Sequence, residues 1–134
     1  MQAVSVCGLV KSYGNVEAVR GISFDVPEGS FFAFLGPNGA GKSTTISAIC
    51  SLLSIDSGTI EVFGRSVSDP SVRNEMGIVF QDPMLDRRLT VRENLEIRGS
   101  MYGLADLKDA VERAMEDADC VGFADRRYGT LSGG

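Results

Sequence analysis

A glycine-rich stretch at residues 36–44 constrains this chain more than any other feature of its sequence. It matches the pattern G-x-x-x-x-G-K-[ST] at every fixed position and reads Gly-Pro-Asn-Gly-Ala-Gly-Lys-Ser-Thr. An unbroken apolar run, residues 31–35, precedes it. Apolar residues at helical spacing follow it: Ile46, Ile49, Cys50 and Leu53. A buried strand, a glycine turn and a helix in this order predict a phosphate-binding loop within an α/β fold.

Each residue type in this stretch suits the binding of phosphate. Glycines let backbone N–H groups turn inward and approach phosphate oxygens, and the following helix adds its positive N-terminal end. We expect the Lys42 ammonium to reach the terminal phosphates, the Ser43 hydroxyl to bind Mg²⁺, and Thr44 to donate to the α-phosphate. The predicted nucleotide-binding residues of the loop are Gly36, Pro37, Asn38, Gly39, Ala40, Gly41, Lys42, Ser43 and Thr44.

The segments before and after the loop predict further strands. Valines within residues 4–10 indicate a first strand, and residues 14–15, Gly-Asn, supply a two-residue turn. In residues 22–26, apolar and polar side chains alternate, which is typical of an antiparallel strand with one wet face. Residues 59–63 predict another short strand, and residues 76–80 a second buried one.

The last third of the chain has the pattern of helices. Thr90 and Glu93 form a capping box, in which each side chain accepts from an unpaired backbone donor of the first helical turn. A further helix is expected from near Asp106. Its predicted apolar face consists of Leu107, Val111, Met115 and Ala118.

Composition disfavours several classes of protein. With 134 residues and 43% apolar content, the chain is suited to one globular core. Its net charge of −5 does not predict the basic surface that binding to nucleic acid requires. The three cysteines, Cys7, Cys50 and Cys120, are far apart, which disfavours a disulfide framework or a zinc site and suits a reducing cytosol. We expect no signal peptide, and the longest apolar stretch is far below a membrane span.

Together with the loop, three further segments resemble the nucleotide-binding domain of ABC (ATP-binding cassette) ATPases. The resemblance runs from residues 9–14 to residues 131–134, Leu-Ser-Gly-Gly. It implies an α/β fold in a partial nucleotide-binding domain: an N-terminal antiparallel β subdomain with the P-loop NTPase core over residues 1–89, and a C-terminal helical subdomain over residues 90–134 that ends in the signature. The runs 89–95 and 101–104 are similar to members that serve drug or sodium export.

The resemblance also implies roles for residues outside the loop. Tyr13 matches the aromatic residue that stacks on adenine, although from the residues alone it also fits an ordinary strand-end tyrosine. Gln81 matches the Q-loop glutamine, whose amide oxygen contacts Mg²⁺ or the attacking water, although a polar strand cap is common. The catalytic residues implied are Lys42 and Gln81. The start of the family signature, which contacts the nucleotide of the opposite subunit, is matched by Ser132, Gly133 and Gly134.

The function implied is that of an ATP-binding subunit with ATP and Mg²⁺ as cofactors. Its expected partners are a transmembrane transporter subunit and a second nucleotide-binding domain, with no nucleic acid, at the cytoplasmic face of the membrane. In the family, a strand ending in a catalytic Asp-Glu pair (Walker B) and a switch histidine follow the signature. Neither is present here, and the chain has no His. We therefore expect a domain truncated before Walker B, with little or no ATPase activity by itself.

Three alternatives remain beside this hypothesis. In the first, the chain binds nucleotide without hydrolysing it. In the second, it belongs to a soluble ABC-family ATPase that acts on nucleic acid or ribosomes. The acidic balance disfavours the second of these. A GTPase is disfavoured because the sequence has no N-K-x-D guanine-reading motif.

Overall fold

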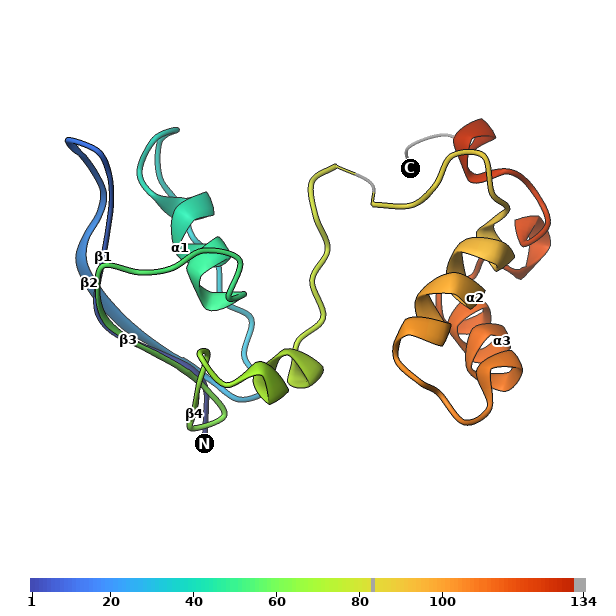
Figure 1. Ribbon diagram of the computed structural model, residues 1–134, viewed down its shortest axis with the longest axis horizontal. Helices are drawn as coiled ribbons and strands as arrows, with labels where there is room; N and C mark the ends of the chain where they lie inside the picture. Colours follow the sequence, from blue (N-terminus) through green and yellow to red (C-terminus); the bar gives the residue numbers. More distant parts are fainter. Residues whose placement is uncertain (83, 132–134) are drawn as a thin grey trace. The chain divides into compact units, whose positions relative to one another are not determined.

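A computed structural model of the chain describes residues 1–82 and 84–131, and Figure 1 shows its helices and strands. Contacts group the chain into two units, Met1–Val79 and Phe80–Gly134. The first carries a β-sheet and a helix, and the second is helical. The subdomain boundary predicted between residues 89 and 90 stays a prediction. No helix in the described part of the chain is long and apolar enough to cross a bilayer.

The first unit is built on a four-stranded antiparallel sheet with the order β2-β1-β3-β4. The strands are β1 (Gln2–Tyr13), β2 (Val16–Pro27), β3 (Ser57–Val62) and β4 (Arg65–Ser66). The predicted hairpin is confirmed, and Gly14 turns the chain with a φ of 58°. The alternation predicted in β2 is confirmed as well, because its apolar residues at 22, 24 and 26 are half-buried and the polar ones between them exposed.

Helix α1 (Lys42–Ile49) packs on this sheet. The core between them consists of Val6, Leu9, Val19, Ala48 and Ile60. The apolar face predicted for this helix is only partly right, because Ile46 is 48% exposed while Thr45 and Ala48 are buried. Small side chains at positions 45 and 48 let the helix approach the sheet closely, and Ile46 lies on another face of the helix. The short 3₁₀ helix η1 (Pro70–Glu75) follows β4 later in this unit.

The buried strands predicted at residues 31–35 and 76–80 are wrong for the described chain. Neither segment is assigned as a strand, and Phe31 and Val79 are 96% and 99% exposed. A strand buried on both faces needs paired neighbours at its edges and cover above and below, and no described segment supplies them here. Phe32 and Phe34 pack on Phe24 of β2, with ring centroids 5.3 and 5.0 Å from its ring. The first segment therefore rests on the hairpin through alternate side chains.

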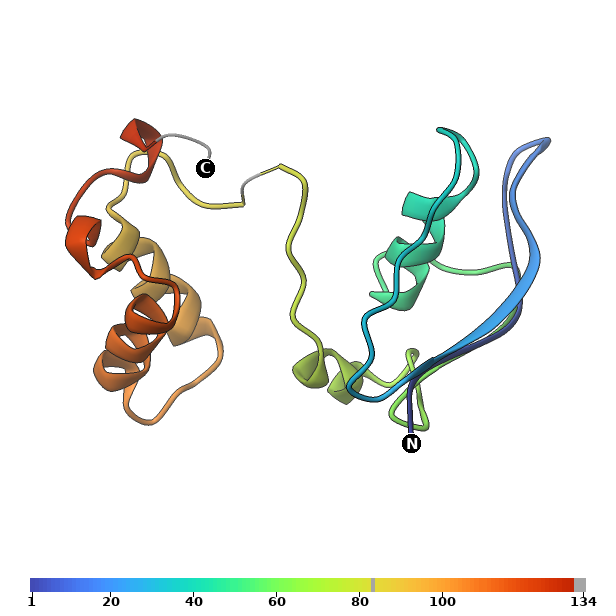
Figure 2. The ribbon, with the colours of Figure 1, turned by 180° about the vertical axis from the view of Figure 1, so that it is seen from behind.

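The second unit contains α2 (Val91–Met101) and α3 (Leu107–Asp117), as predicted, and Figure 2 shows both from behind in yellow and orange. The capping box before α2 is confirmed: Glu93 N donates to Thr90 Oγ1 at 3.1 Å, and Thr90 N donates to Glu93 Oε2 at 2.7 Å. Asp106 caps α3. Two 3₁₀ helices, η2 (Val121–Phe123) and η3 (Tyr128–Thr130), follow.

The core of the second unit lies between its two α-helices. It consists of Val91, Val111, Met115, Cys120 and Ala124. Leu107 packs against this cluster, so three of the four residues of the predicted apolar face are confirmed. Ala118 is exposed, because α3 ends at Asp117 and the chain turns away at that point.

Candidate nucleotide-binding site

Three glycines give residues 36–41 a backbone path that other residues rarely adopt. The φ angles of Gly36, Gly39 and Gly41 are 151°, 83° and 82°. Gly41 also lies against β2, since a Cβ atom there would be 2.3 Å from the carbonyl oxygen of Ala18. This position therefore requires glycine for two separate reasons, backbone conformation and space.

Helix α1 begins directly after this glycine. Gly41 is its N-cap in the left-handed conformation, no side chain caps it, and its first turn carries no acidic residue. The first backbone N–H groups of a helix have no partner within it, and the helix dipole makes this end positive. The start of α1 therefore offers backbone donors and a positive potential to an anion.

The Lys42 ammonium lies within the loop. It donates to the carbonyl oxygens of Gly36 and Pro37, both at 2.6 Å. An ammonium carries three protons, so one donor remains. In the described residues Lys42 forms no ion pair with a carboxylate, so no carboxylate of this part of the chain neutralises its positive charge. The lysine holds the start of the loop against its end.

The other residues predicted to bind nucleotide directly precede or follow Lys42 in the sequence and are accessible to solvent. Ser43 is exposed and Thr44 half-buried in the first turn of α1. Ala40 N donates to Pro37 O at 3.3 Å, which closes a turn at the tip of the loop. An exposed hydroxyl beside a lysine fits a Mg²⁺ ion that takes its other oxygens from phosphate and water. No cluster of three His, Cys, Asp or Glu side chains suited to a metal occurs in the described residues.

Tyr13 ends β1 in the same unit as the loop and is 53% exposed. Figure 1 shows the turn after it, in dark blue, and the loop, in teal, at the same end of this unit. The Lys11 Nζ lies 5.4 Å from the centroid of the Tyr13 ring. Lys11 also pairs with Asp56, at 3.3 Å between Nζ and Oδ1. The pairing of Lys11 with Asp56 is not predictable from the sequence, because the two residues are 45 positions apart and no local motif links them.

The remaining predicted residues lie elsewhere. Gln81 is exposed and belongs to the second unit, so its relation to the loop stays a prediction. Ser132, Gly133 and Gly134 lie outside the described residues, and their role stays a prediction as well. The structure thus brings together the loop residues within one unit and does not test the Q-loop or the signature.

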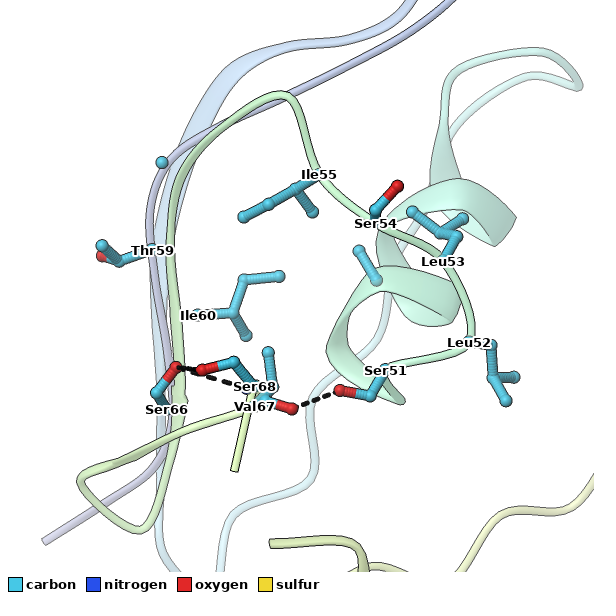
Figure 3. Close-up of a pocket in the computed structure, with 12 residues that line it drawn as sticks. Ser51, Leu52, Leu53, Ser54, Ile55, Thr59, Ile60, Ser66, Val67 and Ser68 are labelled. Atoms are coloured by element: carbon cyan, nitrogen blue, oxygen red, sulfur yellow. Dashed lines mark hydrogen bonds between the residues drawn. The ribbon is translucent and has the colours of Figure 1, made fainter. Parts of the chain in front are cut away.

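A separate cavity of about 560 Å³ opens between the end of α1 and strands β3 and β4. Figure 3 shows its lining, in which Ser51 donates to the carbonyl of Val67 and the hydroxyls of Ser66 and Ser68 are 2.8 Å apart. None of the loop residues 36–44 lines it. This cavity is therefore not the predicted nucleotide site.

The chain is similar to known ATP-binding proteins over nearly its whole length. It is 40% identical to the Nod factor export ATP-binding protein I of Rhizobium sp. (strain N33), over 98% of this chain and 45% of that protein. It is 43% identical to the daunorubicin/doxorubicin resistance ATP-binding protein DrrA of Streptomyces peucetius, over 99% of this chain and 42% of that protein. The chain therefore spans less than half the length of these curated relatives.

Solved structures of ATP-binding cassettes have the same fold. A nucleotide-free ATP-binding cassette from an ABC transporter superposes with a TM-score of 0.80 at 30% identity, covering 99% of this chain and 60% of that one. CbiO1 of Clostridium perfringens, part of the ABC transporter complex CbiONQ, gives a TM-score of 0.86 at 26% identity, covering 98% and 56%. The family model described as ABC transporter matches residues 19–134. The predicted fold class is confirmed, and the chain belongs to the ABC transporter family as an ATP-binding cassette with the α/β P-loop NTPase fold.

Proposed function

We propose that this chain is part of the ATP-binding subunit of an ABC-type membrane transporter and that it binds Mg-ATP through residues 36–44. One observation supports the proposal most strongly. In this member of the family, Lys42 lies at the start of a helix that no side chain caps, directly after a loop with three glycines of positive φ. No described carboxylate forms an ion pair with it. That arrangement offers backbone donors and one ammonium to a polyphosphate.

Each residue of the site has a distinct role in this proposal. The amides of residues 36–41 and the start of α1 hold the phosphates, and Lys42 exchanges its contacts with the loop carbonyls for β- and γ-phosphate oxygens. Ser43 holds the Mg²⁺ ion, which neutralises phosphate charge when bound. Tyr13 supports the adenine ring, and Gln81 contacts the metal or the attacking water. The segment 132–134 contacts the nucleotide of a second cassette.

The same proposal assigns the partners and the place of action. The complete subunit pairs head to tail with a second cassette and docks on a transmembrane subunit at the cytoplasmic face of the membrane. The names of its relatives, which include an export protein and a drug-resistance protein, support a transporter of the export kind. No residue of this chain is assigned as the base that activates water, so we expect hydrolysis by these 134 residues alone to be slow or absent.

Binding is tested with a fluorescent ATP analogue and the variant Lys42→Ala. A hydrogen bond to a charged group contributes about 1.5–3 kcal/mol, so we expect the affinity to fall by about 10- to 150-fold. Lys108→Ala, which removes an exposed lysine from α3, is the matched control and should bind normally. Equal affinity of Lys42→Ala and the unchanged chain would disprove the site.

Hydrolysis is tested separately by steady-state phosphate release. We expect the chain to release phosphate no faster than Lys42→Ala under the same conditions. Release clearly above that variant would show that these residues hydrolyse ATP without a Walker B carboxylate. A preference for GTP over ATP in the binding assay would favour the GTPase alternative.

A further inference from the structure

Asp56 stands at a junction of the first unit. It is the last residue of the segment, 50–56, that connects α1 to β3. Its backbone N–H donates to the carbonyl oxygen of Val10 in β1 at 3.0 Å. Asp56 thus joins the segment that leaves the phosphate-loop helix to the strand that ends at Tyr13.

The Asp56 side chain continues this attachment along β1. The pairing between β1 and β3 shifts register after Cys7 and then reaches Val10 opposite Ser57. Two residues further along β1, the acceptor is a side chain and not the backbone of β3: the backbone N–H of Ser12 donates to Asp56 Oδ2 at 2.6 Å. A carboxylate that accepts from a backbone N–H makes a stronger bond than a neutral acceptor. Through it, Asp56 holds the residue immediately before Tyr13.

A second link runs through Lys11. Its ammonium is 3.3 Å from Asp56 Oδ1 and 5.4 Å from the centroid of the Tyr13 ring, so one cation faces both groups. The Lys11 side chain is 13% exposed, which restricts its freedom to leave this position. A cation near an aromatic face is attracted by the ring quadrupole. The orientation of the ring is therefore coupled to the carboxylate through a nearly buried lysine.

We propose that Asp56 is a positioning residue for Tyr13, which it holds through Ser12 and Lys11 as a fixed platform for the adenine ring. The inference rests on the proposed role of Tyr13 and extends it. Tyr13 is 53% exposed, which leaves area for a flat ligand. A side chain fixed before binding loses less conformational entropy when the ligand arrives, and this preorganisation raises affinity for the base.

The test compares two ligands of the whole chain by titration calorimetry, Mg-ATP and Mg-tripolyphosphate, which has phosphates but no base. Ordering one free side chain on binding lowers an affinity by about 2- to 12-fold, so we expect Asp56→Ala, which leaves Tyr13 to be ordered by the ligand, to weaken ATP binding by about that factor. Its affinity for tripolyphosphate should stay within about twofold. Asp56→Asn keeps an acceptor for Ser12 but loses the charge that pairs with Lys11, and we expect an intermediate affinity for ATP.

The double variant tests whether Asp56 acts through the tyrosine. Stacking of a base on an aromatic ring gives Tyr13→Ala an expected loss of about 5- to 150-fold for ATP and none for tripolyphosphate. In the Tyr13→Ala background, Asp56→Ala should cause no further loss, because coupled residues do not add. Glu75→Ala, which removes the comparable exposed ion pair of Arg65 and Glu75 at 2.9 Å, should bind both ligands normally.

The outcomes separate this inference from the proposed function. If Asp56→Ala and Asp56→Asn weaken ATP and tripolyphosphate equally, or leave ATP binding unchanged, the positioning role is overturned. Additive losses in the double variant overturn it as well. An unchanged ratio of the two affinities in Tyr13→Ala overturns the inference together with the adenine platform, whereas normal ATP binding by Lys42→Ala overturns the phosphate site and the proposed function.

Discussion

The carbonyl oxygen of Ala18 in β2 occupies the space that a Cβ atom on Gly41 would need, at 2.3 Å. The N-cap of α1 thus packs on the backbone of the hairpin without any side chain between them. Close backbone approach of this kind fixes where the positive end of the helix lies, and it explains why the last loop glycine has a packing role besides its conformational one.

We predict that Gly41→Ala destabilises the first unit far more than Gly39→Ala. Both residues have φ near 80°, at 82° and 83°, so both variants lose about 1–2 kcal/mol from a left-handed conformation. A Cβ atom on Gly39 meets nothing within 4 Å, whereas one on Gly41 collides with backbone. Urea unfolding of the two variants measures the difference. Equal midpoints would show that α1 does not depend on this contact.

We predict that Thr90→Ala lowers the free energy of unfolding of the second unit by about 1 kcal/mol, because it removes the N-cap acceptor of α2. Thr90→Ser keeps the hydroxyl and should retain most of the stability. Helix content by circular dichroism during urea unfolding gives the measurement. A serine variant as unstable as the alanine variant would contradict the capping explanation.

Glu93 should make the stability of the second unit depend on pH. The backbone N–H of Thr90 and then its hydroxyl lower the pKa of the Glu93 carboxyl from its ordinary value of 4.5. The unfolded chain therefore binds the proton more readily than the folded one. The stabilisation is fully present above pH 4.5 and is lost as the pH falls through the lower folded pKa.

The matched variant for this pH dependence is Glu93→Gln, which keeps the acceptor of the capping box but does not titrate. Urea midpoints of the two chains should converge as the pH is lowered from about 5.5 to about 3, because only the wild type loses a charged acceptor. A constant difference between them across this range would show that Glu93 does not contribute.

We predict that Asn94→Ala destabilises the segment before α2. Asn94 is 5% exposed; its Oδ1 accepts from Asp86 N at 2.8 Å, and its Nδ2 donates to Asp86 O at 3.0 Å and Thr90 O at 2.9 Å. Each of these hydrogen bonds contributes about 0.5–1.5 kcal/mol, so losing all three should lower the free energy of unfolding of the second unit. Hydrogen exchange at the Asp86 amide should become faster. Ser100→Ala, at an exposed position of the same helix, is the control.

The sequence predicted most of the elements whose stabilising partners are near in the chain. The hairpin of β1 and β2, the capping box at Thr90 and the start of α3 at Asp106 depend on turn residues and caps within a few positions. The strands expected at 31–35 and 76–80 depend on neighbours that no described residue provides, so an apolar run alone was misleading there.

The candidate site shows the same division between local and distant contacts. The loop pattern points to Lys42 and the glycines because a phosphate-binding loop takes its residues from nine consecutive positions, and their role stays a prediction. The contacts of Tyr13 were not predictable, since its support comes from Lys11 on the same strand and from Asp56 far along the chain. Likewise, helical spacing placed Ile46 on the buried face, where the small residues Thr45 and Ala48 lie instead.

Lys42 already donates to two carbonyl oxygens of the loop, so an anion that binds its ammonium has to replace these hydrogen bonds. A singly charged anion such as acetate would form hydrogen bonds with this ammonium that are little stronger than those of the loop carbonyls. In the proposed site, a chain of phosphates would reach the lysine and the start of α1 at once, and its several charges would compensate for the two lost hydrogen bonds. We therefore expect the loop to select ligands by charge and length, independently of any contact with a base.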